Sequence, residues 1–152
     1  MKPRSRALVA RRLGVIALVA ASVAVLAAQR DADALSASEW RAIKSVIAEQ
    51  RAALIAGKAT KAFGYASPGI RSQFGDADTF IAMVRAAYSP LISARRVEFL
   101  EGAVIDGIVV QPLRLIAPDD TVRVALYTME RQDDGRWRIA GCAIAPSTVR
   151  SA

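Results

Sequence analysis

The chain has 152 residues and a formal net charge of +7, with no histidine and a single cysteine, Cys142. This length suits one domain with an appendage. The absence of histidine removes the commonest general base and metal ligand, and one cysteine excludes an intrachain disulfide and a cysteine-rich zinc site. We therefore expect neither a metal nor a cofactor.

The positive charge is concentrated near the N-terminus. Residues 1–34 carry six basic and two acidic side chains, whereas the rest of the chain carries 15 basic and 12 acidic ones. A nearly balanced domain with no basic run interleaved with aromatic residues has an ordinary surface. We therefore expect no nucleic-acid partner.

The N-terminal segment, residues 1–34, has the organisation of an export signal. Basic residues 1–12 precede an uncharged, mostly apolar run over residues 13–28, followed by small residues. As a helix this run would rise only about 24 Å, short of a bilayer core of about 30 Å. Cleavage after Ala27 or after Ala34 fits the pattern, and the alternative is an uncleaved anchor with its basic end in the cytoplasm. We expect a periplasmic protein, either soluble after cleavage or held in the inner membrane by residues 13–28 as its only membrane contact.

The folded domain is expected over residues 35–146, with a frayed tail at 147–152. Ser36 and Glu39 have the spacing of a capping box, and an apolar stripe at helical spacing follows them. Gly57 is a plausible helix end. The pattern predicts a first helix over about 37–56 and a short second helix over about 59–66.

A third helix is expected after the break at Ser67-Pro68-Gly69 and one helical turn over about 70–74. Asp76 or Asp78 can cap its N-terminus, and Pro90 ends it. Its apolar face is formed by Phe80, Met83, Val84, Ala87 and Tyr88.

From residue 94 the apolar period changes from helical to two, which is typical of strands. Strands are expected at about 95–105, 108–117, 121–131 and 136–144. Asp106-Gly107 is a two-residue hairpin signal, and short turns join the other strands. An antiparallel meander follows from these short connections.

The alternation along the last two strands predicts which side chains face the helices. We expect the inner row to be Val122, Val124, Leu126, Trp137, Ile139 and Ala143. We expect the outer row to be Arg123, Ala125, Tyr127, Met129, Arg138, Ala140 and Cys142. Because that outer row is less polar than a solvated sheet face, we predict a homodimer through Tyr127, Met129 and Cys142. Cys142 has no base beside it to make it a nucleophile, so it is a small buried hydrophobe or part of this dimer contact.

Helices followed by an antiparallel sheet indicate an α+β fold. Two patterns resemble the nuclear-transport-factor-2-like superfamily, the cystatin-like α+β cone: Ile43, Ile47, Gln50, Ala53, Gly57-Lys58 and Ala62-Phe63, and the closing Gly135-Arg136-Trp137-Arg138-Ile139-Ala140-Gly141. A narrower set resembles the domain-of-unknown-function family 4864: Gln50, Ala66-Ser67-Pro68, Ile70-Arg71, Phe74-Gly75-Asp76, Phe80, Met83-Val84, Tyr88 and Pro90. These resemblances imply three N-terminal helices packed on a curved four-stranded antiparallel sheet. They also imply an exported bacterial protein with no established activity.

The resemblance to the cone fold implies a pocket between the helices and the concave sheet face. Asp76 could act there as a general base if desolvated, or it could simply cap a helix. The hydroxyls of Tyr65 and Tyr88 could polarise a ligand carbonyl, or the rings could be aromatic core. Arg71 and Arg85 could hold an anionic ligand, or they could form salt bridges with acidic neighbours.

Three functions compete, and fold analogy alone cannot choose between them. We expect a non-catalytic exported module that binds a small apolar or anionic ligand, or a protein partner. The first alternative is an enzyme whose pocket uses Asp and Tyr acid–base chemistry. The second is a structural or assembly protein of the cell envelope.

Overall fold

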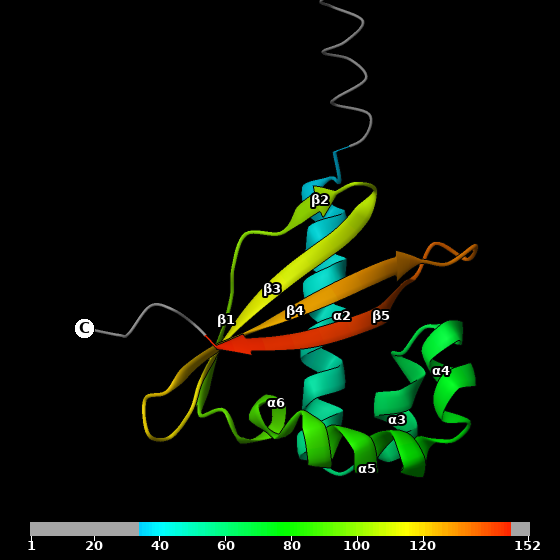
Figure 1. Cartoon of the computed structure of the whole chain (residues 1–152). Coiled ribbons are helices and arrows are strands. Elements are labelled where there is room, and N and C mark those ends of the chain that lie inside the picture. Colours follow the sequence, from blue (N-terminus) through cyan, green and yellow to red (C-terminus); the bar gives the residue numbers. More distant parts are fainter. Residues whose placement is uncertain (1–33, 147–152) are drawn as a thin grey trace, which may run out of the picture. The chain divides into compact units, whose positions relative to one another are not determined.

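The computed structural model describes residues 34–146. The chain divides into two compact units, residues 1–36 and 37–152, and every described helix and strand belongs to the second (Figure 1). The predicted signal or anchor over residues 13–28 and the predicted tail at 147–152 lie outside the described residues. None of the helices within residues 34–146 is both long enough and apolar enough to span a bilayer.

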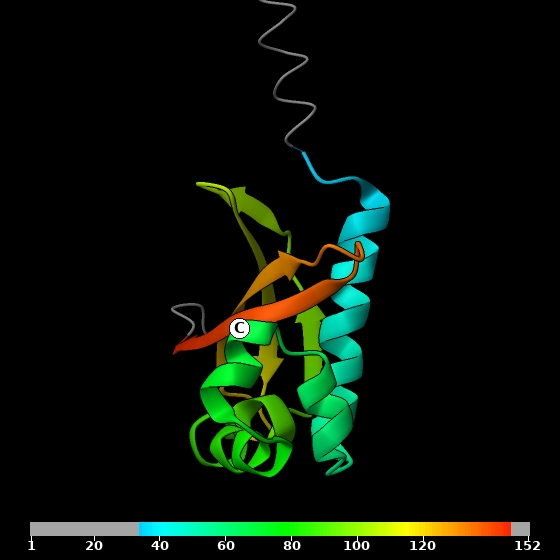
Figure 2. The same cartoon turned by 90° about the vertical axis from the view of Figure 1, so that its right-hand side faces the viewer.

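Within residues 34–146, five helices precede five strands, so the predicted α+β order is confirmed (Figure 1). The helices are α2 (Ala37–Ile55), α3 (Ala59–Gly64), α4 (Pro68–Phe74), α5 (Ala77–Ala87) and α6 (Ser89–Ser93). The strands are β1 (Arg96–Phe99), β2 (Ala103–Ile105), β3 (Ile108–Ile116), β4 (Val122–Arg131) and β5 (Trp137–Pro146). Helix α2 runs along one face of the sheet, and α3 to α6 gather below one end of that face (Figures 1 and 2).

The sheet is open and antiparallel, in the order β1-β3-β4-β5, with β2 also paired to β3. The predicted count of four strands is wrong, because the run at 95–105 divides into β1 and β2. The division coincides with Gly102, where an added Cβ would lie 2.2 Å from the ring of Trp40. Trp40 of α2 therefore packs against bare backbone at this point, and the strand is interrupted there.

Helix α2 forms because its buried residues recur at helical spacing. Ile43, Ile47, Gln50 and Leu54 are all buried on one face. The helix ends at Gly57, which has a φ of 68°; the Gly57 N–H donates to the Leu54 carbonyl and the next N–H donates to the Ala53 carbonyl. These two bonds form a Schellman motif, and they confirm the predicted helix end.

Helices α4 and α5 each begin with a residue whose side chain caps the first turn. The Ser67 hydroxyl accepts from the Ile70 N–H at 3.3 Å at the start of α4, and Asp76 Oδ1 accepts from the Thr79 N–H at 2.7 Å at the start of α5. The prediction that Asp76 or Asp78 caps this helix is confirmed for Asp76. Pro90 lies in the first turn of α6 rather than simply ending α5, because a missing N–H costs nothing at that position.

The predicted inner and outer rows of β4 are reversed in the structure. Ala125, Tyr127 and Met129 are buried against the helices, whereas Leu126 is 39 % exposed on the outer face. Both rows of β4 are rich in apolar residues, so alternation identifies two faces without saying which one is covered. The prediction that Tyr127 and Met129 lie on an outer dimer face is therefore wrong.

A β-bulge explains the position of Cys142. Met129 pairs with Ile139 and Thr128 pairs with Gly141, so Ala140 is an extra residue in β5. An extra residue in a strand moves each side chain after it to the opposite face of the sheet. Trp137 and Ile139 are buried as predicted, but Cys142 lies opposite Tyr127 on the helix side, and its predicted outward position is wrong.

Candidate functional site

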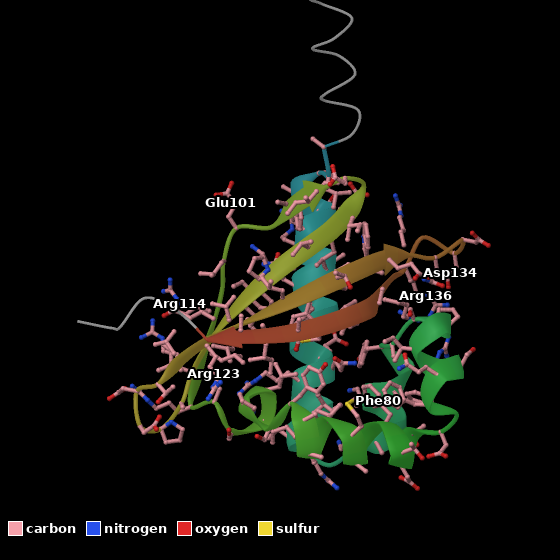
Figure 3. The ribbon with its side chains drawn as sticks, in the orientation of Figure 1. Phe80, Glu101, Arg114, Arg123, Asp134 and Arg136 are labelled. Carbon is pink, nitrogen blue, oxygen red and sulfur yellow. The ribbon has the colours of Figure 1, made fainter. Side chains whose placement is uncertain are left out.

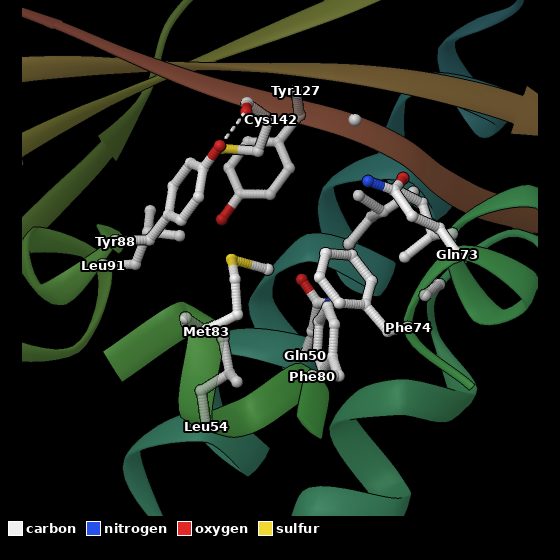
Figure 4. A pocket seen from close by; sticks show the side chains of 15 residues that line it. Gln50, Leu54, Gln73, Phe74, Phe80, Met83, Tyr88, Leu91, Tyr127 and Cys142 are labelled. Carbon is white, nitrogen blue, oxygen red and sulfur yellow. Dashed lines mark hydrogen bonds between the residues drawn. The ribbon is translucent and has the colours of Figure 1, made fainter. Parts of the chain in front are cut away.

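A cavity of about 210 Å³ lies between the inner face of β4 and β5 and the helices α2, α4 and α5 (Figure 4). Fifteen residues line it, and most of them are apolar. Among the described residues, no Asp, Glu, Lys or Arg contributes to this lining. The cavity is therefore an apolar space with a few neutral polar groups, which is the usual composition of a small-molecule site.

The floor of the cavity is built from aromatic and aliphatic side chains of α2, α4 and α5. The Phe80 ring packs against Phe63 with centroids 5.3 Å apart and against Phe74 at 5.8 Å, edge to face. Phe80 and Leu54 are buried, and Met83 projects beside them toward the sheet (Figure 4). Because the aromatic side chains fix one another, this wall is held in place without a ligand.

Tyr127 is a buried polar residue of the cavity lining. The residue is 1 % exposed, and its hydroxyl points toward Met83 and the open space (Figure 4). Within residues 34–146 this hydroxyl makes no hydrogen bond to a side chain or to the backbone. Burial raises the pKa of Tyr127, so the hydroxyl stays protonated and can donate.

Gln50 supplies a second neutral polar group from α2. Its Nε2 donates to the Ala62 carbonyl at 3.2 Å, which fixes the orientation of the carboxamide. The carboxamide oxygen is then directed into the cavity (Figure 4). A donor from Tyr127 and an acceptor from Gln50 thus meet in the same apolar space.

Tyr88 and Cys142 border the cavity at the edge strand. The Tyr88 hydroxyl donates to the Cys142 carbonyl at 3.1 Å and ties the end of α5 to β5 (Figure 4). Burial raises the pKa of the Cys142 thiol to about 12. The thiol is therefore mainly in its neutral, weakly nucleophilic form at physiological pH.

Tyr88 is the one predicted site residue that lines this cavity. Tyr65 instead borders a separate surface groove with Lys61 and Arg138. Its hydroxyl donates to Glu49 at 2.5 Å, and this bond raises the pKa of Tyr65 and lowers the pKa of Glu49. Tyr65 and Tyr88 therefore do not act on one ligand.

Asp76, Arg71 and Arg85 are exposed and do not line the cavity. Hydrogen bonds from the backbone and side chain of Thr79 lower the pKa of Asp76. The carboxylate is therefore a solvated helix cap, and the desolvated general base that we considered is not formed. The two arginines are not positioned to hold an anion inside the cavity.

Charged side chains lie at the periphery of the domain. Glu101, Arg114, Arg123, Asp134 and Arg136 all project outward, whereas Phe80 points inward (Figure 3). In the part of the chain that the structure describes, no group of three or more His, Cys, Asp or Glu residues is placed to hold a metal ion.

One feature of the sequence points to this site, namely the polar residue Gln50 in the first helix. Gln50 interrupts the apolar stripe of the first helix, and a polar residue at a buried position needs a reason. The sequence does not point to Tyr127, because the alternation along β4 predicts that Tyr127 lies on the outer face of the sheet.

A family model described as a domain of unknown function (DUF4864) matches residues 36–152. No curated protein and no solved structure matches the chain. The match covers the whole domain that contains the cavity, and it agrees with the narrower resemblance predicted from the sequence. The chain belongs to the DUF4864 family.

Proposed function

We propose that the domain is a non-catalytic binding module for a small, uncharged, mainly apolar molecule. The observation that carries the proposal is the cavity of about 210 Å³ with its mostly apolar walls and its neutral polar side chains, of which Tyr127 and Gln50 are buried and Gln73 lies at the exposed side. An engineered apolar cavity of about 150 Å³ is large enough for benzene. The space under β4 and β5 therefore suits a single-ring compound or a short aliphatic one.

The chemistry of the lining favours binding over catalysis. General acid–base catalysis needs a group whose pKa lies near the operating pH. The raised pKa values of Tyr127 and Cys142 keep both groups protonated at neutral pH, and the Gln50 carboxamide does not titrate. No ionised group belongs to the described lining; Arg51, whose charge acts on Tyr127, lies outside it and donates to the Leu91 and Ala94 carbonyls.

We also propose that the module is exported and has the nuclear-transport-factor-2-like topology. The support for export is the basic, apolar and small-residue order of residues 1–34. The support for the topology is the helices-then-sheet order, with a cavity between the helices and one sheet face.

Met83→Trp tests the proposed function by filling the cavity. Met83 is half-buried and lies beside Phe80, so an indole at this position would occupy the space that a ligand needs. We expect a small apolar probe such as toluene to shift the methyl signals of Leu91 and Ile139 in the unaltered chain. We expect the affinity to fall at least about tenfold in the variant, since roughly 1.4 kcal/mol of lost contact is a factor of ten.

Ala86→Trp is the matched control for this experiment. Ala86 is exposed on the same helix and does not line the cavity. Its substitution should leave toluene binding unchanged. The proposal fails if toluene does not bind the unaltered chain, or if both tryptophan variants bind it equally well.

Self-association stays a prediction, but its expected surface moves to the true outer face of the sheet. Leu126 is 39 % exposed there, with Ile105 57 % and Ile108 53 % exposed at the β2–β3 hairpin. An apolar face of this kind marks an interface. Leu126→Lys should convert a dimer to a monomer in light scattering, whereas Ala86→Lys should not; a monomeric unaltered chain at high concentration would contradict the dimer.

A further inference from the structure

We propose that the ligand carries a hydroxyl group on its apolar body, and that Tyr127 and Gln50 select it. This inference rests on the proposed function, because it specifies the chemistry of the molecule that the cavity holds. It is built on two buried side chains that face the same cavity, one from β4 and one from α2 (Figure 4).

The Tyr127 hydroxyl creates the requirement for a polar ligand atom. Its residue is 1 % exposed, and its hydroxyl makes no hydrogen bond to another residue of 34–146, while its oxygen stays accessible from the cavity. Leaving a donor in an apolar space without a partner is costly, so the Tyr127 hydroxyl gains from a water molecule or from a polar ligand atom. A ligand that displaces this water binds well only if it replaces the lost hydrogen bond.

Gln50 makes the requirement more specific. Its Nε2 is held by the Ala62 carbonyl, so the carboxamide presents an oxygen that only accepts. A hydroxyl is the smallest group that serves both side chains, because its oxygen accepts from Tyr127 and its hydrogen donates to Gln50. A carboxylate would face the Gln50 oxygen. The charge of Arg51 does act on Tyr127, but the guanidinium donates to the Leu91 and Ala94 carbonyls and does not line the cavity.

This selectivity has a general physical basis. An apolar site discriminates weakly between ligands of one shape, but a site with buried polar groups rejects analogues that leave those groups unpaired. Alcohols and phenols should therefore bind more tightly than hydrocarbons of the same size, although hydrocarbons leave water more readily. The neutral lining should exclude the corresponding acids at neutral pH.

Phenol, toluene and benzoate are suitable probes because they share one ring and differ in the attached group. With the full chain at pH 7, we expect phenol to bind at least roughly fivefold more tightly than toluene, since a net hydrogen bond is worth about 1 kcal/mol. Benzoate should not bind detectably. The dissociation constants can be measured by nuclear magnetic resonance titration of the methyl groups around the cavity.

Tyr127→Phe should reverse this preference, so that toluene binds as tightly as phenol or more tightly. The thermal midpoint of the variant should not fall, because the missing hydroxyl has no partner in the described structure. Tyr65→Phe is the matched control: it also removes one hydroxyl, but outside the cavity, and it should leave the preference for phenol unchanged.

The two possible failures are distinguishable. If neither phenol nor toluene binds, the proposed binding function is overturned. If toluene binds the unaltered chain at least as tightly as phenol, or if Tyr127→Phe leaves the preference for phenol in place, the cavity remains a binding site and the hydroxyl inference is overturned.

Discussion

Replacing Gln111 with glutamate should destabilise the domain by about 3–5 kcal/mol at neutral pH, the range for an uncompensated buried charge. Gln111 is fully buried in β3, and its Nε2 donates to the Leu100 carbonyl at 2.8 Å and to the Pro112 carbonyl at 2.9 Å. Its Oε1 already lacks a partner within the described residues. A carboxylate there would meet two carbonyl oxygens and no donor.

The loss of folding stability caused by Gln111→Glu should depend on pH. Burial raises the pKa of the new carboxyl above its unfolded value of about 4.3, because the neutral form can still donate one hydrogen bond. The folded state then binds more protons than the unfolded state between the two pKa values, so stability falls as pH rises through that interval. The charge penalty is absent below the unfolded pKa and complete above the folded one.

Gln111→Met is the matched control, because it has a similar length and no charge. Urea unfolding of both variants between pH 4 and pH 8 measures the free energy of unfolding of each. The difference between the two variants should be small near pH 4 and should grow as pH rises. Equal stability at every pH would show that the new carboxylate reaches solvent, and it would contradict the enclosed position of the Gln111 side chain.

Gly102→Ala should cost roughly 1–3 kcal/mol, the usual cost of overpacking. The new Cβ would lie 2.2, 2.7 and 2.8 Å from three carbons of the Trp40 ring, so the indole must leave its position. Displacing the indole also disturbs the junction of β1 and β2. Chemical denaturation gives the change in free energy of unfolding.

Two comparisons make this prediction specific. Gly64→Ala adds the same methyl group in α3, where no atom lies within 4 Å, and it should be neutral or stabilising by roughly 0.5–1 kcal/mol. Trp40→Leu should make the Gly102→Ala penalty smaller, because residues in contact are not additive. A full penalty in the Trp40→Leu background would show that the clash with the indole is not its cause.

Helix ends were predictable because they are encoded locally. Gly57 adopts the left-handed backbone that ends α2, and the Asp76 carboxylate accepts from an N–H three residues away. The hairpin at Asp106-Gly107 was predictable for the same reason, since both residues have positive φ values. These features depend on a few neighbouring residues and on no distant contact.

The sheet faces and the site were not predictable in this way. Which row of β4 is covered depends on where the helices pack, and both rows are apolar enough to be buried. The bulge at Ala140 depends on pairing with β4 and reversed the assignment of Cys142. The break between β1 and β2 includes Gly102, which packs against Trp40 about sixty residues earlier in the chain.

The location of the candidate site depends on these long-range contacts. Asp76, Arg71 and Arg85 carry conspicuous chemistry in the sequence, but they belong to the solvated surface. The neutral residues Gln50 and Tyr127 are the buried polar side chains of the cavity lining, and a neutral side chain in an apolar pattern is a weak signal in a single sequence. The expected ligand therefore changes from an apolar or anionic molecule to a small uncharged one.

Native mass spectrometry of the full chain, recovered from the cell without denaturation, tests the binding function most directly. We predict a chain mass increased by one molecule of below roughly 200 Da, in keeping with a cavity slightly larger than one that holds benzene. The increment should disappear on unfolding, and it should be absent from Met83→Trp but present in Ala86→Trp. A bare chain mass that small neutral probes do not change would contradict the binding function.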